Sequence, residues 1–72
     1  MKGSEFLKKL KALAKTRSWG FEWRPDRGKG RHGMVYLNGQ KTVVRNLKDE
    51  LKTGTFHGML RQLGIDESDL HD

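Results

Sequence analysis

The sequence contains no cysteine, a single proline and few hydrophobic residues, which make up only 33% of its 72 positions. Without cysteine the chain can form no disulfide, thiol nucleophile or cysteine-based zinc site, and a reducing cytoplasm is the expected compartment. No apolar run approaches the roughly 20 residues that a transmembrane helix needs. Lysines interrupt the apolar stretches near the N-terminus, so we expect no signal peptide either.

Acidic residues are also scarce. The chain has 15 Lys and Arg against 9 Asp and Glu, a formal net charge of +6. Residues 1–61 hold all 15 bases and 5 acids, a charge of +10, whereas residues 62–72 hold 4 acids and no base, a charge of −4. A basic body of this kind indicates a polyanionic partner. The length allows one small domain with an economical core. We assign that domain to residues 1–65 and a short acidic tail, with a short turn or a frayed end, to residues 66–72.

Two amphipathic helices are predicted. Ser4 is a suitable N-cap for the first, and Thr53 or Thr55 for the second. Gly64 is a natural residue to end the second helix, and Ile65 can make the apolar contact that accompanies such an end. The apolar stripes with helical spacing are Phe6, Leu7, Leu10, Leu13 and Ala14 in the first helix and Phe56, Met59, Leu60 and Leu63 in the second. Lysines cover the rest of the first helix, which favours a core helix with a solvated basic face over a membrane-binding helix.

Three strands are predicted between the helices. Aromatic residues alternate with other residues from Trp19 to Arg24, which is typical of a strand with its aromatics on one face, and Pro25 ends the pattern. Residues 32–37 and 40–45 flank Asn38-Gly39, the strongest short signal for a hairpin. The sequence therefore predicts an α+β fold of order α-β-β-β-α, in which two helices cover one face of a three-stranded antiparallel sheet.

A two-residue turn sets the register of this hairpin, so that residue 36 pairs with 41, 34 with 43 and 32 with 45. One face then carries no charge and is the expected core face: Gly33, Val35, Leu37, Thr42 and Val44. The other is the expected open face: His32, Met34, Tyr36, Lys41, Val43 and Arg45.

Among the three histidines, His32 is the best candidate for a catalytic residue. It follows a segment rich in glycine and positive charge, in which Gly30 lets a ligand approach the backbone and Lys29 and Arg31 can hold phosphate. Nearby cations also favour the neutral imidazole, which can act as a base. A histidine without a role beside a plain flexible turn is the alternative, and the segment is not a P-loop.

The other two histidines give no sign of a site. His57 lies outside the apolar stripe of the second helix and is expected on the surface, whereas His71 belongs to the tail. No pair of acids or histidines has the spacing of metal ligands, so we expect neither a metal nor another cofactor. Cleavage of RNA without a metal needs a base for the 2′-hydroxyl and cations for the charge that develops on the phosphate. His32 can supply the base, and the second acid stays open between Tyr36 and a lysine.

Three short segments follow one another along the chain: residues 29–32 (Lys-Gly-Arg-His), 50–56 (Glu-Leu-Lys-Thr-Gly-Thr-Phe) and 60–65 (Leu-Arg-Gln-Leu-Gly-Ile). Together with Thr42-Val43 they resemble the HicA-like (YcfA-like) toxins, which are small mRNA interferases of bacterial type II toxin–antitoxin systems. The likeness covers most of the chain, from about residue 6 to residue 65. The resemblance implies a compact relative of the double-stranded-RNA-binding domain, whose element order matches the order predicted above.

The resemblance also implies an activity and a partner. The family's hallmark is a Gly-Ser-His segment with a catalytic histidine, which carries over to Gly30 and His32, with Arg31 in place of the serine. Val44 and Asn46 stand where many members have a proline and a second histidine. The expected protein is thus a monomeric, metal-independent endoribonuclease that cleaves mRNA and is inhibited by a HicB-like antitoxin covering its active face. The residues expected to contact RNA or its phosphates are Lys29, Gly30, Arg31, Tyr36, Lys41 and Arg45.

Two other functions compete with this one. A non-catalytic RNA-binding module of the same fold would use the same basic charge and the exposed Tyr36. A small DNA-binding protein would place the helix at 55–63 in a groove, but that helix offers only His57, Arg61 and Gln62 as polar readers.

Overall fold

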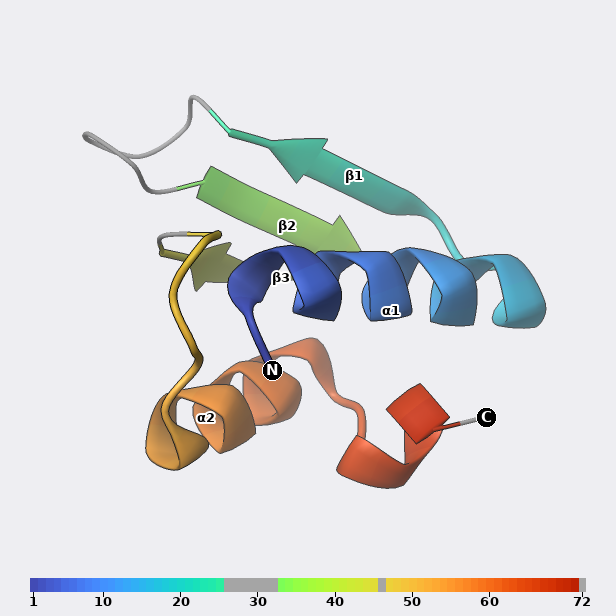
Figure 1. The fold of residues 1–72 in the computed structure, drawn as a ribbon. Coiled ribbons are helices and arrows are strands. Elements are labelled where there is room, and N and C mark those ends of the chain that lie inside the picture. The colour runs from blue at the N-terminus through green and yellow to red at the C-terminus, as the bar shows by residue number, and fades with distance from the viewer. Residues whose placement is uncertain (26–32, 46, 72) are drawn as a thin grey trace.

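The computed structural model describes residues 1–25, 33–45 and 47–71. Its elements are α1 (Gly3–Arg17), β1 (Phe21–Arg24), β2 (Gly33–Leu37), β3 (Gln40–Val44), α2 (Thr53–Leu63) and a 3₁₀ helix, η1 (Glu67–His71). The predicted order α-β-β-β-α is confirmed, with η1 added after α2 (Figure 1). Neither helix in this part of the chain is long and apolar enough to cross a bilayer.

The three strands form one antiparallel sheet in the order β1-β2-β3. Asn38 and Gly39 both have positive φ, 51° and 81°, which is the backbone of a type I′ turn and explains why this pair closes the hairpin. The turn sets the predicted register, with Tyr36 opposite Lys41 and Met34 opposite Val43. The first strand begins at Phe21, two residues after the start that the aromatic alternation indicates.

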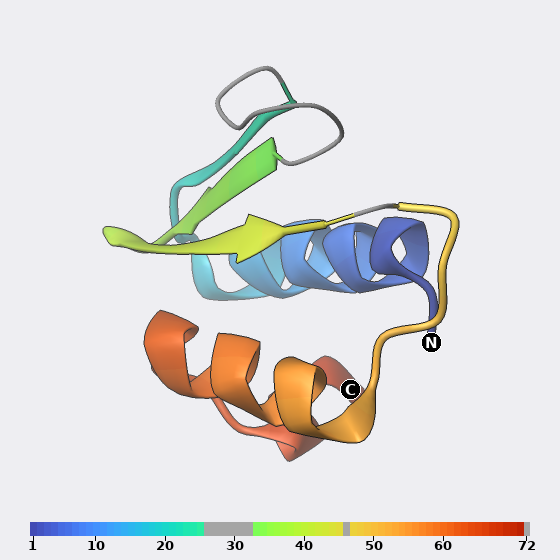
Figure 2. The same ribbon diagram turned by 90° about the vertical axis from the view of Figure 1, so that its left-hand side faces the viewer.

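The core lies between one face of the sheet and the helices. Val35, Leu37 and Val44 are completely buried on that face, as the alternation predicts. The helices run side by side, with α1 against the sheet and α2 beside β3 (Figures 1 and 2). They contribute the apolar stripes that the sequence indicates, of which the buried members are Phe6, Leu10, Leu13, Ala14, Met59, Leu60 and Leu63. The stripe of α1 is therefore used by the core and is not presented to a membrane.

The start of α1 differs from the prediction. Ser4 is not the N-cap, because the helix begins at Gly3 after Lys2 and has no side-chain cap. The first N–H groups of a helix need other acceptors, and here the backbone of the connector between β3 and α2 supplies them. Gly3 N–H donates to the carbonyl of Asp49 (3.3 Å) and Ser4 N–H to that of Leu47 (3.0 Å). A contact between distant segments thus replaces the local cap.

The two ends of α2 have different outcomes. The predicted threonine cap is wrong, because the helix begins at Thr53 after Lys52 and no side chain caps it. The predicted end is confirmed: Gly64 has φ +73°, its N–H donates to Arg61, and Ile65 N–H donates to the Leu60 carbonyl. These two bonds define a Schellman motif, and Ile65 is buried as that motif favours.

The acidic end of the chain is part of the fold. Its Leu70 is only 6% exposed and belongs to the core. Asp69 forms an ion pair with Arg17 of α1 at 2.8 Å, and its carboxylate accepts a hydrogen bond from Asp66 N–H at 2.9 Å. The acidic tail is thus packed against the rest of the fold at Asp69 and Leu70, and the predicted short turn at Asp66 extends into η1. The sequence did not indicate this docking, because Leu70 is the single apolar residue of the acidic segment.

Candidate functional site

The face of the sheet opposite the core forms the candidate site. We define the open face as Glu22, Arg24, Met34, Tyr36, Lys41 and Val43. Pairing across the three strands arranges them in two rows: Glu22, Tyr36 and Lys41 in one, and Arg24, Met34 and Val43 in the other. Each strand thus contributes two residues, because side chains alternate between the faces of a sheet.

Tyr36 is at the centre of the first row, on the middle strand. The guanidinium of Arg24 lies over its ring, 5.6 Å from the ring centroid, and also pairs with the Glu22 carboxylate. An arginine in this position is attracted to the ring face and is oriented by the carboxylate. Planar aromatic and guanidinium groups are also the surfaces on which unpaired nucleic-acid bases stack. This corner of the open face therefore has the chemistry of a base-binding platform.

Lys41 lies on the other side of Tyr36, at the edge strand, and is exposed. Two residues further along the same strand, Val43 has 41% of its surface exposed, which is high for a large apolar residue. The structure thus brings together two of the predicted RNA-contacting residues, Tyr36 and Lys41, as direct cross-strand neighbours. A cation next to an aromatic ring can hold a phosphate while the base is stacked.

Arg45, the third predicted contact that the structure describes, borders a different feature. It is exposed and lines a groove of about 390 Å³ between β3 and α2. Thr42, Val43, Thr55, Gly58, Met59 and Gln62 complete this groove. Within it the hydroxyl of Thr42 donates to the side-chain carbonyl of Gln62, which ties the two elements together. We refer to it below as the β3–α2 groove.

The predicted catalytic residue, His32, and the predicted contacts Lys29, Gly30 and Arg31 lie outside the described residues. The same holds for the predicted pairing of His32 with Arg45. Gly33, the next residue after His32, is buried and pairs with Val44. A methyl group at Gly33 would come within 2.2 Å of the Trp23 ring, so only glycine fits under that ring. The start of β2 is thus held closely against the β1 aromatic.

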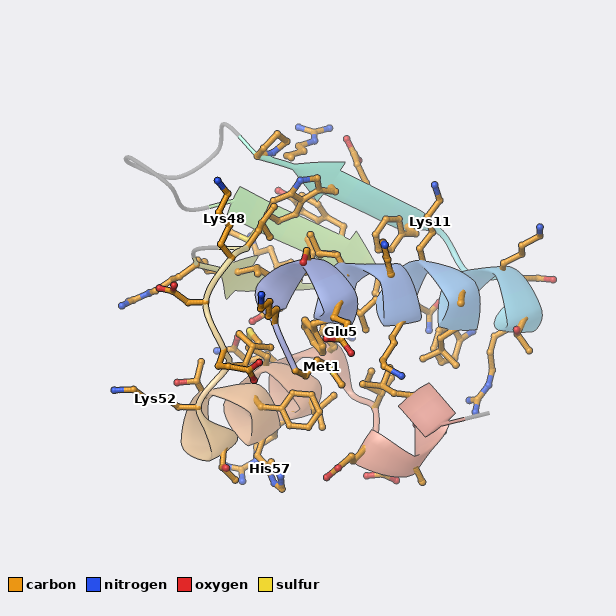
Figure 3. The ribbon with its side chains drawn as sticks, in the orientation of Figure 1. Met1, Glu5, Lys11, Lys48, Lys52 and His57 are labelled. Carbon is orange, nitrogen blue, oxygen red and sulfur yellow. The ribbon has the colours of Figure 1, made fainter. Side chains whose placement is uncertain are left out.

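His57 is on the surface, as the sequence predicts, and belongs to α2, away from the open face. Its side chain is 54% exposed and points away from the core on the outer side of α2 (Figure 3). Its Nε2 lies 3.6 Å from a Glu67 carboxylate oxygen. Within residues 1–25, 33–45 and 47–71, no three His, Asp or Glu side chains lie together as metal ligands do.

Glu22 and Arg24 were not singled out as site residues in the sequence. The signal was present, because they occupy the alternate positions of the strand whose aromatics are predicted to share one face. Their pairing with Tyr36 depends on the β1–β2 register, and residues 25–32 separate these two strands in the sequence.

Comparisons of the chain with protein-family models, curated protein sequences and solved structures find no match.

Proposed function

We propose that this protein is an mRNA interferase of the HicA-like kind: a metal-independent endoribonuclease toxin in which His32 is the catalytic residue. The observation that carries the proposal is the Gly30–His32 segment, which leads directly into β2 of a basic hairpin. The element order supports it, because the resemblance implies the same α-β-β-β-α order and a relation to the double-stranded-RNA-binding domain. Its place of action is the cytoplasm, where mRNA is found.

The open face offers groups that bind RNA around the bond to be cleaved. In the proposed reaction a base at His32 removes the 2′-hydroxyl proton, the 2′-oxygen attacks the adjacent phosphorus, and the 5′-oxygen leaves with a proton from an acid. Tyr36 and Arg24 offer a surface for a base beside the cleaved bond, and Lys41 offers a charge for the phosphate. Each of these groups lies on a strand, where the sheet fixes its position.

A HicB-like antitoxin is the proposed inhibitor. Lys41 near the start of β3 and Arg45 directly after its end are both exposed, so an acidic protein surface and RNA would compete for them. Competition for one basic face is the simplest way in which such a partner stops cleavage.

The proposal is tested with purified protein and single-stranded RNA in EDTA. Wild type should cleave and His32→Ala should not, whereas the matched control His57→Ala, with the histidine removed on the outer side of α2, should cleave like wild type. Cleavage by both wild type and His32→Ala, or by neither in the absence of antitoxin, would overturn it. In cells, expression should arrest growth and His32→Ala should relieve the arrest.

A second candidate is a non-catalytic RNA-binding module. The observation that favours it is the stacked Arg24–Tyr36 pair, which offers a stacking surface for bases and needs no catalytic group to do so. In that case wild type binds single-stranded RNA and leaves it intact, and His32→Ala binds as well as wild type.

A further inference from the structure

The free edge of the sheet is the first observation. β3 pairs with β2 on one side, and no other described strand lies on its second side. Leu37 and Gln40 flank the two-residue turn and form the hydrogen-bonded pair that closes it. Because backbone groups alternate in direction along an antiparallel strand, those of Lys41 and Val43 point away from β2. The outer edge therefore offers N–H and C=O groups to another strand.

The second observation is a glycine that the fold does not require. Gly58 lies in the middle of α2, where glycine costs about 1 kcal/mol relative to alanine. An added methyl group there would meet nothing within 4 Å, and no positive φ is involved. Gly58 lines the β3–α2 groove, directly beside the free edge. A missing side chain at this point leaves room for the close approach of a chain lying along β3.

The charge beside the groove indicates which side chains a segment bound there should carry. Lys41 and Arg45 are exposed cations on either side of Val43, whose exposed side chain is apolar. A strand added to β3 would direct alternate side chains toward these three residues and the others toward Gly58 and Met59 in the groove. Acidic side chains suit the first set of positions and small or medium apolar side chains suit the second.

We propose that the free edge of β3 and the β3–α2 groove together bind an extended acidic segment of a partner protein, which adds to the sheet as a fourth strand. The proposal concerns the strand edge, and it stands whether or not His32 cleaves RNA. A second copy of this chain fits poorly, because antiparallel pairing of two β3 edges about Val43 sets Lys41 opposite Arg45 of the other copy, and facing like charges are destabilising.

The test uses the full chain, labelled with ¹⁵N, and an eight-residue peptide of alternating Glu and Val. On saturation with this peptide, the amide protons of Lys41 and Val43 should exchange at least tenfold more slowly, and the signal of Gly58 should shift. A peptide of alternating Lys and Val has the same strand propensity and the opposite charge, and it should leave all three unchanged.

Two variants test the edge and the groove separately. Gly58→Gln fills the groove and should weaken peptide binding at least tenfold. Gly54→Gln is the matched control, because Gly54 is in the same helix, also has nothing within 4 Å, and lies outside the groove lining, so its affinity should stay within twofold. Val43→Pro removes an outward N–H without breaking a bond to β2 and should abolish binding, whereas Val43→Thr should retain it.

Thermal unfolding establishes that each variant is folded. If Val43→Pro does not fold, the comparison of Gly58→Gln with Gly54→Gln tests the proposal without it. Unchanged exchange of Lys41 and Val43 at saturating peptide would overturn the proposal, as would equal affinities of Gly58→Gln and Gly54→Gln. An eight-nucleotide RNA that protects the same amides in preference to the peptide would assign the groove to RNA instead. Protection that grows with protein concentration alone, together with dimer formation, would assign it to a second copy.

Discussion

The guanidinium of Arg24 lies over the ring of Tyr36 on the neighbouring strand, 5.6 Å from its centroid, and pairs with the Glu22 carboxylate of its own strand. The contact joins two strands whose order in the sheet places Tyr36 at the centre of the open face. An aromatic ring stacked with a cation on one side and next to Lys41 on the other combines a surface for bases with charge for phosphates.

Replacing Tyr36 should therefore weaken RNA binding through loss of stacking. We expect Tyr36→Ala to lower affinity for single-stranded RNA by about 1–3 kcal/mol, the usual value for one stacked base. Tyr36→Phe keeps the ring and should bind within about twofold of wild type. Fluorescence anisotropy with a labelled oligonucleotide measures both. Equal binding by Tyr36→Ala and wild type would show that bases do not stack on this face.

Lys41 should act through charge alone. Its loss in Lys41→Ala should reduce the slope of log affinity against log salt concentration by about 0.7, the value for one phosphate contact on a single strand. Lys11→Ala removes an equal charge from an exposed position of α1, and the slope should not change. Titrations at four or more salt concentrations give the slopes. If both variants change the slope equally, the protein attracts RNA by its net charge and not through the open face.

The sequence predicted most of the fold because its strongest signals are local. The Asn38-Gly39 turn needs positive φ at both residues, and that requirement alone set the β2–β3 register. The end of α2 at Gly64 was predictable for the same reason. The start of α1 was not, because its N–H groups are satisfied by carbonyls of Leu47 and Asp49, more than forty residues away in the chain.

The candidate site was predictable only where it depends on that turn. Tyr36 and Lys41 are paired by the hairpin register, so alternation identified them. The contribution of Arg24 depends on the pairing of β1 with β2, and the sequence from residue 25 to residue 32 carries no signal that fixes this register as Asn38-Gly39 fixes that of β2 and β3. The docking of η1 was hidden in a similar way, because only Leu70 distinguishes the acidic segment from a solvated tail.

The ion pair between Arg17 and Asp69 predicts an acid-sensitive contact. The hydrogen bond from Asp66 N–H, followed by the Arg17 guanidinium, lowers the pKa of Asp69 below its ordinary value. A carboxyl whose pKa is lower in the folded state stabilises that state above its unfolded pKa, and the stabilisation is lost as the pH falls through the folded pKa.

Asp69→Asn should therefore be less stable than wild type at pH 7, and the difference should disappear as the pH falls below about 4, near the ordinary value for an aspartate. Urea unfolding at a series of pH values measures the difference. Asp66→Asn is the control, because the Asp66 backbone N–H remains in place and the pH dependence of wild type should persist. A constant difference between wild type and Asp69→Asn at every pH would contradict the assignment.

The close contact between Gly33 and Trp23 predicts a steric requirement at the start of β2, immediately after the predicted catalytic residue. Gly33→Ala places a methyl carbon 2.2 Å from the Trp23 ring, so ring or strand must move. Overpacking of this kind costs about 1–3 kcal/mol, to be measured as a loss of free energy of unfolding in urea. Gly20→Ala is the control, since nothing lies within 4 Å of the added carbon, and its stability should be close to that of wild type.

A second variant tests whether the Trp23 ring causes this loss of stability. In a Trp23→Val background the space above Gly33 is open, so Gly33→Ala should lose most of its destabilising effect. If the two substitutions instead add, the destabilisation has another origin than contact with the ring.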